Sequence, residues 1–525
     1  MSENRKIISS AGLVGSFTTL SRIFGLVRDM VIARFFGASM ATDAFFVAFR
    51  IPNILRRLFA EGALTVSFIP VLKEAQVKEG HAEAKRISDI VFTFLTIILA
   101  FVVITGILLA PIIVKLIAPG FTSPDKYELT VYLTRIIFPY IFLICIVAFA
   151  MGVLNSVGRF AAPAAAPVLL NISIIFSAIA LSPLFDQPVV ALSVGVLAGG
   201  VLQVLLQIPS MKKEGYLPSI SFDFKHPALK KLLLLMAPAL FGIAVYQLNI
   251  FVSTIIASFL PEGSVSYLYY ADRFFQLPLG IFVISLATAI LPTMSDQVAS
   301  NRLEDMRDSL AFSIKVIFFV TLPAAAGLYA VSIPVFSLFF QRGEFDYSTT
   351  VKTAQALQFY AVGLWAIGGV KIIVPAFYAM QDMKTPVKAA FFAFIANIVL
   401  SLLLMGPLQH GGLALATSLS SLLNFVLLLL IIRKRVGAIV DRSLVLSFMR
   451  SLIASVIVAV IAGFICSMGN WEVDGMTIDK VAVLSAAIGA GMLSYFLFSF
   501  LFRSEEMTYI LNVIKTKVRG RLAKD

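Results

Sequence analysis

The sequence predicts an all-α polytopic membrane protein with about fourteen transmembrane helices. First, 59% of its 525 residues are hydrophobic and only 14% are charged, with a mean hydropathy of +0.95. Second, its apolar runs reach the ~20 residues that a helix needs to cross a bilayer, rather than the ~10 alternating residues of a barrel strand. Third, lysine and arginine are concentrated in every second connection between these runs. This alternation is typical of helices that cross a membrane in opposite directions.

Polar residues, glycine or proline separate the apolar runs and give approximate limits for each span. In chain order, the expected spans are 8–36, 41–72, 87–117, 128–155, 160–182, 187–209, 229–259, 264–295, 308–340, 350–380, 386–406, 412–433, 446–469 and 480–502. The first resembles a signal peptide, but no small-residue cleavage site follows, so we expect it to be retained.

The charges of the connections predict the orientation. Connections that follow even-numbered spans are basic, as at Lys73, Lys212 and Arg302. Connections that follow odd-numbered spans are weakly charged or acidic, as at Asp186 and Glu262. Because short cytoplasmic loops are enriched in lysine and arginine, both termini are predicted to be cytoplasmic. The same distribution accounts for the net charge of +13 without a nucleic-acid partner.

The chain repeats weakly at an offset of about 225 residues. Ile32-Ala33 and a later helix with Pro52 are matched by Ile256-Ala257 and a later helix with Pro278. Because six is an even number of membrane crossings, the second repeat would have the same orientation as the first. The two six-helix lobes would then be related by a pseudo-two-fold axis along the membrane normal, with two C-terminal helices added. The predicted parts are an N-lobe at 1–210, a cytoplasmic inter-lobe linker at 211–228, a C-lobe at 229–434, a C-terminal helix pair at 435–503 and a basic cytoplasmic tail at 504–525.

Arginines inside the first two spans predict the site. Placing one guanidinium at membrane depth costs at least ~2.5–3.5 kcal/mol, so several together need a compensating partner. The cations of these spans include Arg22, Arg28, Arg50, Arg56 and Arg57, whereas the acids are Asp29, Asp43 and Glu61. Because cations outnumber acids, we expect a water-filled cavity that receives an anion. A phosphate or pyrophosphate fits, since guanidinium groups bind such oxygens bidentately.

Local ion pairs are the alternative interpretation of these charges. Arg22 with Asp29, Arg57 with Glu61, and Arg273 with Asp272 are the candidate pairs, and Arg50 and Lys371 are candidates for snorkelling to an interface. We predict substrate binding by Arg22, Arg28, Arg56 and Arg273. The predicted secondary cavity or gate residues are Asp29, Asp43, Asn53, Arg57, Glu61, Asp272 and Lys371. No catalytic residue and no metal site is predicted: Cys145 and Cys466 lie in apolar runs, and the three histidines lack ligand spacing.

Several stretches resemble the MurJ (MviN) family. They are Ser21-Arg22-Ile23-Phe24-Gly25-Leu26-Val27-Arg28-Asp29, the segment from Gly37 to Phe46, the segment from Pro52 to Ala63, Tyr269-Tyr270-Ala271-Asp272-Arg273, Asn171-Ile172-Ser173 and Lys384-Thr385-Pro386-Val387. The resemblance implies a lipid II flippase of peptidoglycan biosynthesis, hence of cell-wall biogenesis and cell shape. It further implies a two-lobed, fourteen-helix fold of the MOP superfamily. It also implies that Arg22, Arg28, Arg56 and Arg273 match essential cavity arginines and that Asp43 is an important acid.

The resemblance also carries expectations about coupling, partners and location. Some family members have a sodium site; Asn397 and Thr417 match its polar positions here, but span seven has no carboxylate. A monovalent cation and the membrane potential are therefore both open as the driving force, and no other cofactor is expected. The expected cargo is lipid II, an undecaprenyl-pyrophosphate-linked disaccharide peptide. We expect a monomer in the bacterial cytoplasmic (inner) membrane, surrounded by membrane lipids, with the division or elongation machinery as candidate partners.

Three other functions stay open at this point. One is a MOP-type exporter of another polyprenyl-linked saccharide or of a drug, although a drug exporter would be expected to present carboxylates rather than arginines. Another is a membrane-embedded enzyme acting on the same lipid, for which the chain has no nucleophile, base or metal-ligand pattern. The last is a scaffold for the division machinery, for which the short loops offer little docking surface.

Overall fold

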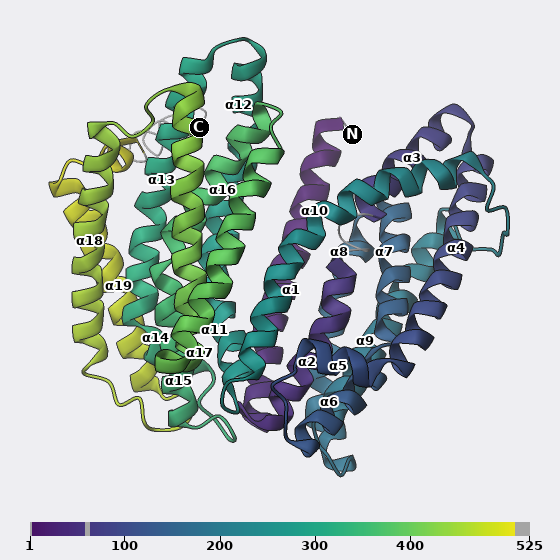
Figure 1. Ribbon diagram of the computed structural model, residues 1–525, viewed down its shortest axis with the longest axis horizontal. Coiled ribbons are helices and arrows are strands. Elements are labelled where there is room, and N and C mark those ends of the chain that lie inside the picture. Colours follow the sequence, from purple (N-terminus) through teal and green to yellow (C-terminus); the bar gives the residue numbers. More distant parts are fainter. Residues whose placement is uncertain (1–2, 58–63, 510–525) are drawn as a thin grey trace, which may run out of the picture. The chain divides into compact units, whose positions relative to one another are not determined.

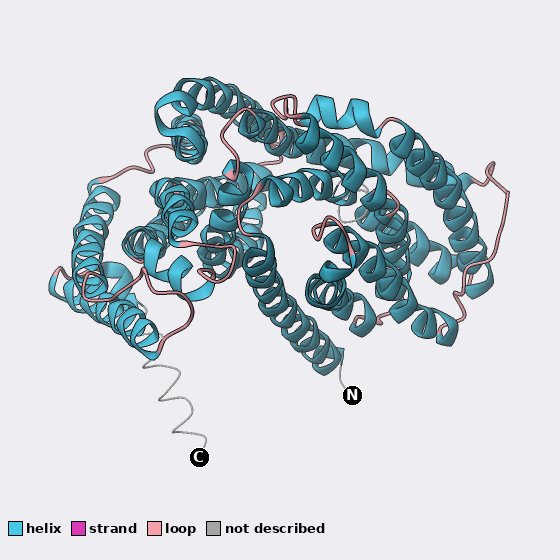
Figure 2. Ribbon diagram, turned by 90° about the horizontal axis from the view of Figure 1, so that it is seen from below, coloured by secondary structure: helices cyan, strands magenta, loops and turns pink. Residues whose placement is uncertain are grey.

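The computed structural model describes residues 3–57 and 64–509, with no account of the side chains at 3–11, 65–66 and 237–246 (Figure 1). Within these described ranges the regular elements are all helices, and the one extended pairing is an isolated bridge between Arg342 and Phe345. Figure 2 shows the same helical architecture without a sheet. The predicted all-α fold class is confirmed.

The chain divides into two compact units, Met1–Ser266 and Tyr267–Asp525, which are described separately. This division differs from the predicted start of the second lobe at residue 229, because α10 (Pro227–Ser258) packs in the first unit. Contacts near both of its ends hold it there. Lys231 Nζ lies 2.6 Å from Glu74 Oε2, and Gly120 N donates to Ser258 Oγ at 3.0 Å. Hydropathy cannot predict in which unit α10 packs, since a span has the same composition in either unit.

The first unit contains the helices of the predicted spans one to seven. They are α1 (Glu3–Phe36), α2 (Met40–Leu55), α3 (Thr65–Lys78), α4 (His81–Leu108), α5 (Ala110–Ile117), α6 (Pro124–Ile137), α7 (Tyr140–Ser156), α8 (Ala161–Phe176), η2 (Ser177–Leu181), η3 (Ser182–Leu184), α9 (Val190–Lys213) and α10. Breaks fall where the sequence contains proline or glycine. Pro139, for example, separates α6 from α7 and cannot donate a backbone hydrogen bond.

The second unit contains the helices of the predicted spans eight to fourteen. They are α11 (Ser264–Pro278, whose first turn lies in the first unit), η4 (Leu279–Val283), α12 (Ile284–Ala299), α13 (Leu303–Ala330), α14 (Ser332–Phe339), α15 (Tyr347–Val362), α16 (Leu364–Ala379), α17 (Lys384–Val436), α18 (Arg442–Cys466) and α19 (Ile478–Leu501). α11 ends at Pro278 and continues as the π-helical turn η4, which is a common response to proline inside a helix.

Every expected span coincides with helix, apart from residues 58–63, which lie outside the described residues. By length and composition, nine of the described helices could cross a membrane, or ten if α15 and α16, bent by 43°, form one span. α1, the α2–α3 pair and α10 each include residues whose side chains are not described. The polytopic membrane class is thus confirmed, and the count of fourteen stays a prediction.

α17 is a hairpin of two expected spans rather than one long helix. Its 53 residues are interrupted at Gln409, where φ is 50° and ψ is −129°. Asn397 Nδ2 donates to Ser420 Oγ at 3.2 Å, although 23 residues of straight helix would separate them by about 35 Å. A Cβ on Gly412 would lie 2.3 Å from the Leu404 carbonyl oxygen, so the reversal requires glycine there. The expected spans 386–406 and 412–433 are its two arms.

Contacts between connections sort by charge in the first unit. The connections at 37–43, 118–126 and 259–266, which we call its weakly charged end, meet at Asp43, where Lys126 Nζ lies 2.9 Å from Asp43 Oδ2. The connections at 73–86, 158–160 and 212–231, its basic end, are joined by Arg159–Glu214 at 2.7 Å and Arg86–Asp223 at 2.8 Å. Basic connections therefore lie together, as alternating helix directions require.

The second unit shows the same sorting. Its basic end joins 296–315, 380–388, 433–443 and 503–509, with Arg435 Nη2 2.6 Å from Asp382 Oδ2 and Lys315 Nζ 3.0 Å from Glu505 Oε2. Its weakly charged end joins 337–350 and 466–480, with Gln341 Nε2 donating to the Glu472 carbonyl at 2.8 Å. In both units, the charge pattern of the connections matches their spatial grouping.

The predicted linker packs firmly on α4. Ser219 N donates to Asp89 Oδ1 at 2.9 Å, and Ser221 N donates to Thr93 Oγ1 at 2.9 Å. The side chain of His226 accepts from Ala228 N at the start of α10. Residues 214–226 thus form a strap along the basic end of the first unit.

Candidate functional site

Arg28 is the most enclosed of the predicted substrate-binding arginines. Only 7% of it is exposed, and it lies on α1 beside Asp29, which is 1% exposed. Arg28 Nη2 and Nε donate to Asp29 Oδ1 at 2.6 and 3.0 Å, and Nη1 donates to Asn171 Oδ1 of α8 at 3.1 Å. Asp29 therefore pairs with its neighbour Arg28, whereas the sequence suggested a pair with Arg22. Successive helical residues diverge by about 100°, but the long arginine side chain bends back to the carboxylate.

Asn171 is a site residue that the sequence analysis did not select, although it lies in one of the motifs. It is 6% exposed, and its Nδ2 donates to the Ser21 carbonyl of α1 at 3.1 Å. One amide thus holds both the backbone of α1 and the guanidinium of Arg28. Its only sequence signal is a polar residue in the apolar helix Ala161–Phe176.

Arg22 presents a different environment on the same helix. Its side chain is exposed, and it has no hydrogen bond or ion pair to the described residues. Arg57 is also exposed, and its predicted partner Glu61 lies outside the described residues, so that pair is untested. Arg22 is therefore an accessible cation of α1, as is Arg34, whereas Arg28 is enclosed.

The arginines of α2 make local and interhelical contacts. Arg50 Nη1 donates to Thr254 Oγ1 of α10 at 2.6 Å, so Arg50 joins two helices rather than snorkelling alone. Asn53 Nδ2 donates to the Phe49 carbonyl at 3.1 Å, within the same helix. The half-buried Arg56 ends α2, and its backbone N–H contacts the carbonyls of Asn53 and Pro52.

Asp43 is a buried junction at the weakly charged end of the first unit. Its Oδ2 accepts from Lys126 Nζ and from Gly263 N, both at 2.9 Å. Its Oδ1 accepts from Ser266 N at 3.0 Å and Ser266 Oγ at 2.7 Å. One carboxylate thereby ties the start of α2 to α6 and to the first turn of α11. Lys126 and Ser266 were missed because nothing local in the sequence identifies the partners of Asp43.

The predicted cations of the second unit are exposed. The guanidinium of Arg273 lies 4.6 Å from the ring centroid of Tyr269 and donates to its hydroxyl. Asp272 Oδ1 accepts from Gln276 Nε2 at 3.2 Å. Lys371 is exposed on α16, where most neighbouring residues are buried. Arg273 and Lys371 are therefore accessible in this unit, and their convergence with the arginines of the first unit remains a prediction.

Asn397 and Thr417, the residues weakly matched to a sodium site, do lie together. Asn397 Nδ2 donates to Thr417 Oγ1 at 3.4 Å and to Ser420 Oγ at 3.2 Å, across the two arms of α17. Among the described residues, no group of three or more His, Cys, Asp and Glu could hold a metal ion. The oxygens of this cluster are all uncharged. The identity of a coupling ion stays a prediction.

Comparison with known proteins adds an independent finding. The family model for "Lipid II flippase MurJ" matches residues 32–503. The lipid II flippase MurJ of Burkholderia cenocepacia is 39% identical over 485 residues, covering 90% of this chain and 93% of the relative. The probable lipid II flippase MurJ of Vibrio cholerae is 35% identical, covering 94% and 95%.

Solved structures of the same family and of the same fold also match this chain. A lipid II flippase MurJ in an inward closed conformation matches with a TM-score of 0.78 and 29% identity, covering 94% of this chain and 99% of that one. An inward-facing multidrug resistance MATE transporter of the MOP superfamily matches with a TM-score of 0.67 at 15% identity, covering 80% and 95%. The second match shows a shared fold alone.

Proposed function

This chain belongs to the lipid II flippase MurJ family, and on that premise we propose that it moves lipid II from the cytoplasmic to the outer leaflet by alternating access. The relatives match nearly end to end, so the family assignment covers the whole transport unit. It is accordingly a transporter of the MOP superfamily fold rather than an enzyme.

The observation that carries the proposed mechanism is an exposed guanidinium on a membrane helix in each unit. Arg22 lies on α1 and Arg273 on α11, and both are accessible. An arginine at membrane depth needs water or an anion beside it. The pyrophosphate of lipid II supplies such an anion, and each guanidinium presents paired N–H donors to its oxygens. We assign Arg22 and Arg273 to the first capture of the head group, with Arg56 in support.

Arg28 is suited to a later step of the transport cycle, the release of the cargo. Its donors are already directed to Asp29 and Asn171, so the cargo must compete with these partners. A site that binds its cargo equally in every state cannot release it, because only differential affinity shifts a conformational equilibrium. We propose that Arg28 exchanges between Asp29 and the pyrophosphate during the cycle, so that Asp29 displaces the cargo at release.

Alanine substitutions at Arg22, Arg28 and Arg273 test this mechanism, with Arg302→Ala as the matched control. Arg302 is an exposed arginine at the basic end of the second unit, paired with Asp296 at 3.1 Å. The assay is outward translocation of lipid II at equal protein level. We expect losses of tenfold or more for the three site variants and unchanged transport for the control. Full transport in both R22A and R273A would refute the anion site.

The driving force is proposed to be the membrane potential or a monovalent cation acting at the Asn397–Thr417 cluster. A flux assay in proteoliposomes separates the two. Replacing sodium by choline at constant potential abolishes transport only if a cation couples it. Collapsing the potential with an ionophore at constant sodium abolishes transport only if the potential drives it.

We propose that the basic ends face the cytoplasm of a bacterial inner membrane, which places both termini there. The grouping of basic connections in each unit supports this orientation. Labelling of Asn301→Cys and Glu472→Cys with a membrane-impermeant thiol reagent in intact cells tests it, on a background lacking Cys145 and Cys466. Only Glu472→Cys should react, and labelling of Asn301→Cys alone would reverse the topology.

A further inference from the structure

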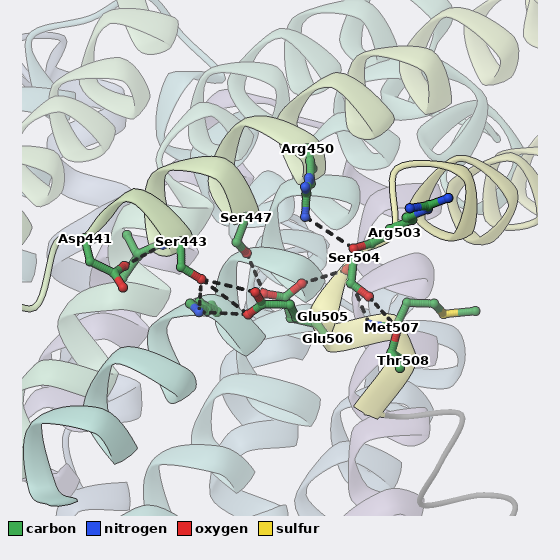
Figure 3. A network of polar contacts seen from close by, with 12 residues as sticks. Asp441, Ser443, Ser447, Arg450, Arg503, Ser504, Glu505, Glu506, Met507 and Thr508 are labelled. Atoms are coloured by element: carbon green, nitrogen blue, oxygen red, sulfur yellow. Dashed lines mark hydrogen bonds and ion pairs between the residues drawn. The ribbon is translucent and has the colours of Figure 1, made fainter.

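A cavity of about 420 Å³ opens at the basic end of the second unit, away from the predicted transport residues. Side chains at the start of α18 line one side, and the turn after α19 lines the other (Figure 3). Arg503 adopts a left-handed backbone with φ of 52°, and Ser504 N then bonds back to the Ser499 carbonyl at 3.0 Å. This turn directs Glu505 and Glu506 toward α18.

The carboxylates of this cavity are held in place by hydroxyl groups and one lysine. Glu506 is 2% exposed and accepts from Ser447 Oγ at 2.5 Å and from Ser504 Oγ at 2.6 Å. Glu505 lies 3.0 Å from Lys315 Nζ of α13, and its oxygens are 3.3 Å from Ser443 Oγ. Lys315 and Ser443 lower the pKa of Glu505, so this carboxylate stays ionised at neutral pH.

Two arginines supply the opposite charge from α18. Arg442 is exposed and makes no hydrogen bond or ion pair with the described part of the chain. Arg450 Nη1 donates to the Arg503 carbonyl at 3.2 Å, which leaves its other N–H groups available. Ser443, Ser447 and Arg450 share one helix face at i, i+4 and i+7 spacing. The cavity thus presents two arginines along α18, together with the N-cap carboxylate of Asp441, which accepts from Leu444 N at 2.7 Å, and two further carboxylates along the opposing turn.

The cavity lies at the ends of two helices that are long and apolar enough to cross a membrane. α18 begins at Arg442 and α19 ends at Leu501, so both helix ends border it. Large apolar side chains are exposed beside it, with Leu446 at 41% and Leu501 at 58%. Such a combination of a polar cavity and an apolar rim is suited to a ligand with a charged head and an acyl tail.

We propose that this cavity binds the head group of a zwitterionic phospholipid with a primary ammonium group. The phosphate lies on Arg442 and Arg450, because guanidinium groups bind phosphate oxygens bidentately. The ammonium donates to Glu505, and the acyl chains run along the exposed apolar residues of α18 and α19. The carboxylates discriminate against anionic head groups, and a quaternary choline has no N–H to donate to them.

Native mass spectrometry of the full-length, delipidated protein tests the site by titration with phosphatidylethanolamine, phosphatidylglycerol and phosphatidylcholine. We expect phosphatidylethanolamine to bind most tightly. Arg442→Gln and Arg450→Gln should each weaken its binding threefold to tenfold, whereas the control Arg302→Gln leaves it unchanged. Glu505→Gln removes the carboxylate partner of Lys315, whose Nζ then keeps only its hydrogen bond to Ser443 Oγ at 2.6 Å, and should shift the preference toward phosphatidylglycerol.

Two results would overturn the proposal. Equal binding of the three lipids by the unaltered protein would remove the head-group recognition. Unchanged affinity in both arginine variants would place the lipid elsewhere. Arg442→Gln guards against a folding artefact, since Arg442 has no partner among the described residues and its replacement disturbs no contact there. An unchanged melting temperature for that variant confirms that the comparison is sound.

Discussion

The junction at Asp43 gives the sharpest test of the structure. Replacing Asp43 by Asn keeps one carbonyl oxygen but places an NH₂ group against donors in either orientation, facing Lys126 Nζ and Gly263 N in one and Ser266 N in the other. Lys126 is 9% exposed and would lose its carboxylate partner. Removing one partner of a buried ion pair costs about 3–5 kcal/mol, because the remaining charge is left uncompensated. The same estimate applies to the reverse deletion, Lys126→Met, which leaves Asp43 with three hydrogen-bond donors.

A double-mutant cycle measures this junction. Each kcal/mol shifts the melting temperature of a domain of this size by about 2–4 °C, so each single variant should melt about 6–20 °C lower. The double variant Asp43→Asn with Lys126→Met should be more stable than the sum of the single losses predicts, by at least about 1.5 kcal/mol. The assay is thermal unfolding of the purified protein in detergent at a fixed scan rate. Additive losses within about 0.5 kcal/mol would refute the buried pair.

Three further outcomes are expected. Hydrogen bonding to Lys231 and Lys78 lowers the pKa of Glu74 from 4.5 to about 2. The contribution of Glu74 to stability is therefore complete above pH 4.5 and is lost as the pH falls toward 2. The melting temperatures of Glu74→Gln and of the unaltered protein should differ at pH 7 and converge near pH 2. Gly412→Ala places a Cβ against a carbonyl and should lower the melting temperature by several degrees, whereas Gly406→Ala, with open space around it, should not; equal effects would contradict the hairpin geometry. Asn171→Ala removes a hydrogen bond to Arg28 and should reduce lipid II translocation severalfold at unchanged expression, and full transport would show that this amide does not position Arg28.

The helices were predictable because hydrophobic length determines where they lie. Even the reversal in α17 follows from Pro407 and Gly411, which lie between two expected spans where the structure has its break at Gln409. The sorting of the connections by charge was also predictable, since it depends on short loops alone. These features need no knowledge of which helices touch.

The contacts of the site were less predictable because they depend on tertiary packing. Asn171 meets Arg28 across 143 residues of sequence, when α1 packs on α8. Asp43 meets Lys126 across 83 residues, and hydropathy gives no sign that these two spans are neighbours. The choice of Asp29 between Arg22 and Arg28 depends on side-chain conformation rather than on helical spacing. Charge counting therefore selected candidate residues without identifying their partners, and the roles of these residues stay predictions.

The strap along α4 has a practical consequence for anyone who engineers this protein. A protease must draw several residues of backbone into its active site, but the amides of Ser219 and Ser221 are already committed to side chains of α4. Exposed Lys225 should accordingly resist trypsin in the folded protein, despite lying between two long helices. Fluorescent reporters inserted at 219–221 would detach the segment and disturb its neighbours, so such fusions belong at other surface turns.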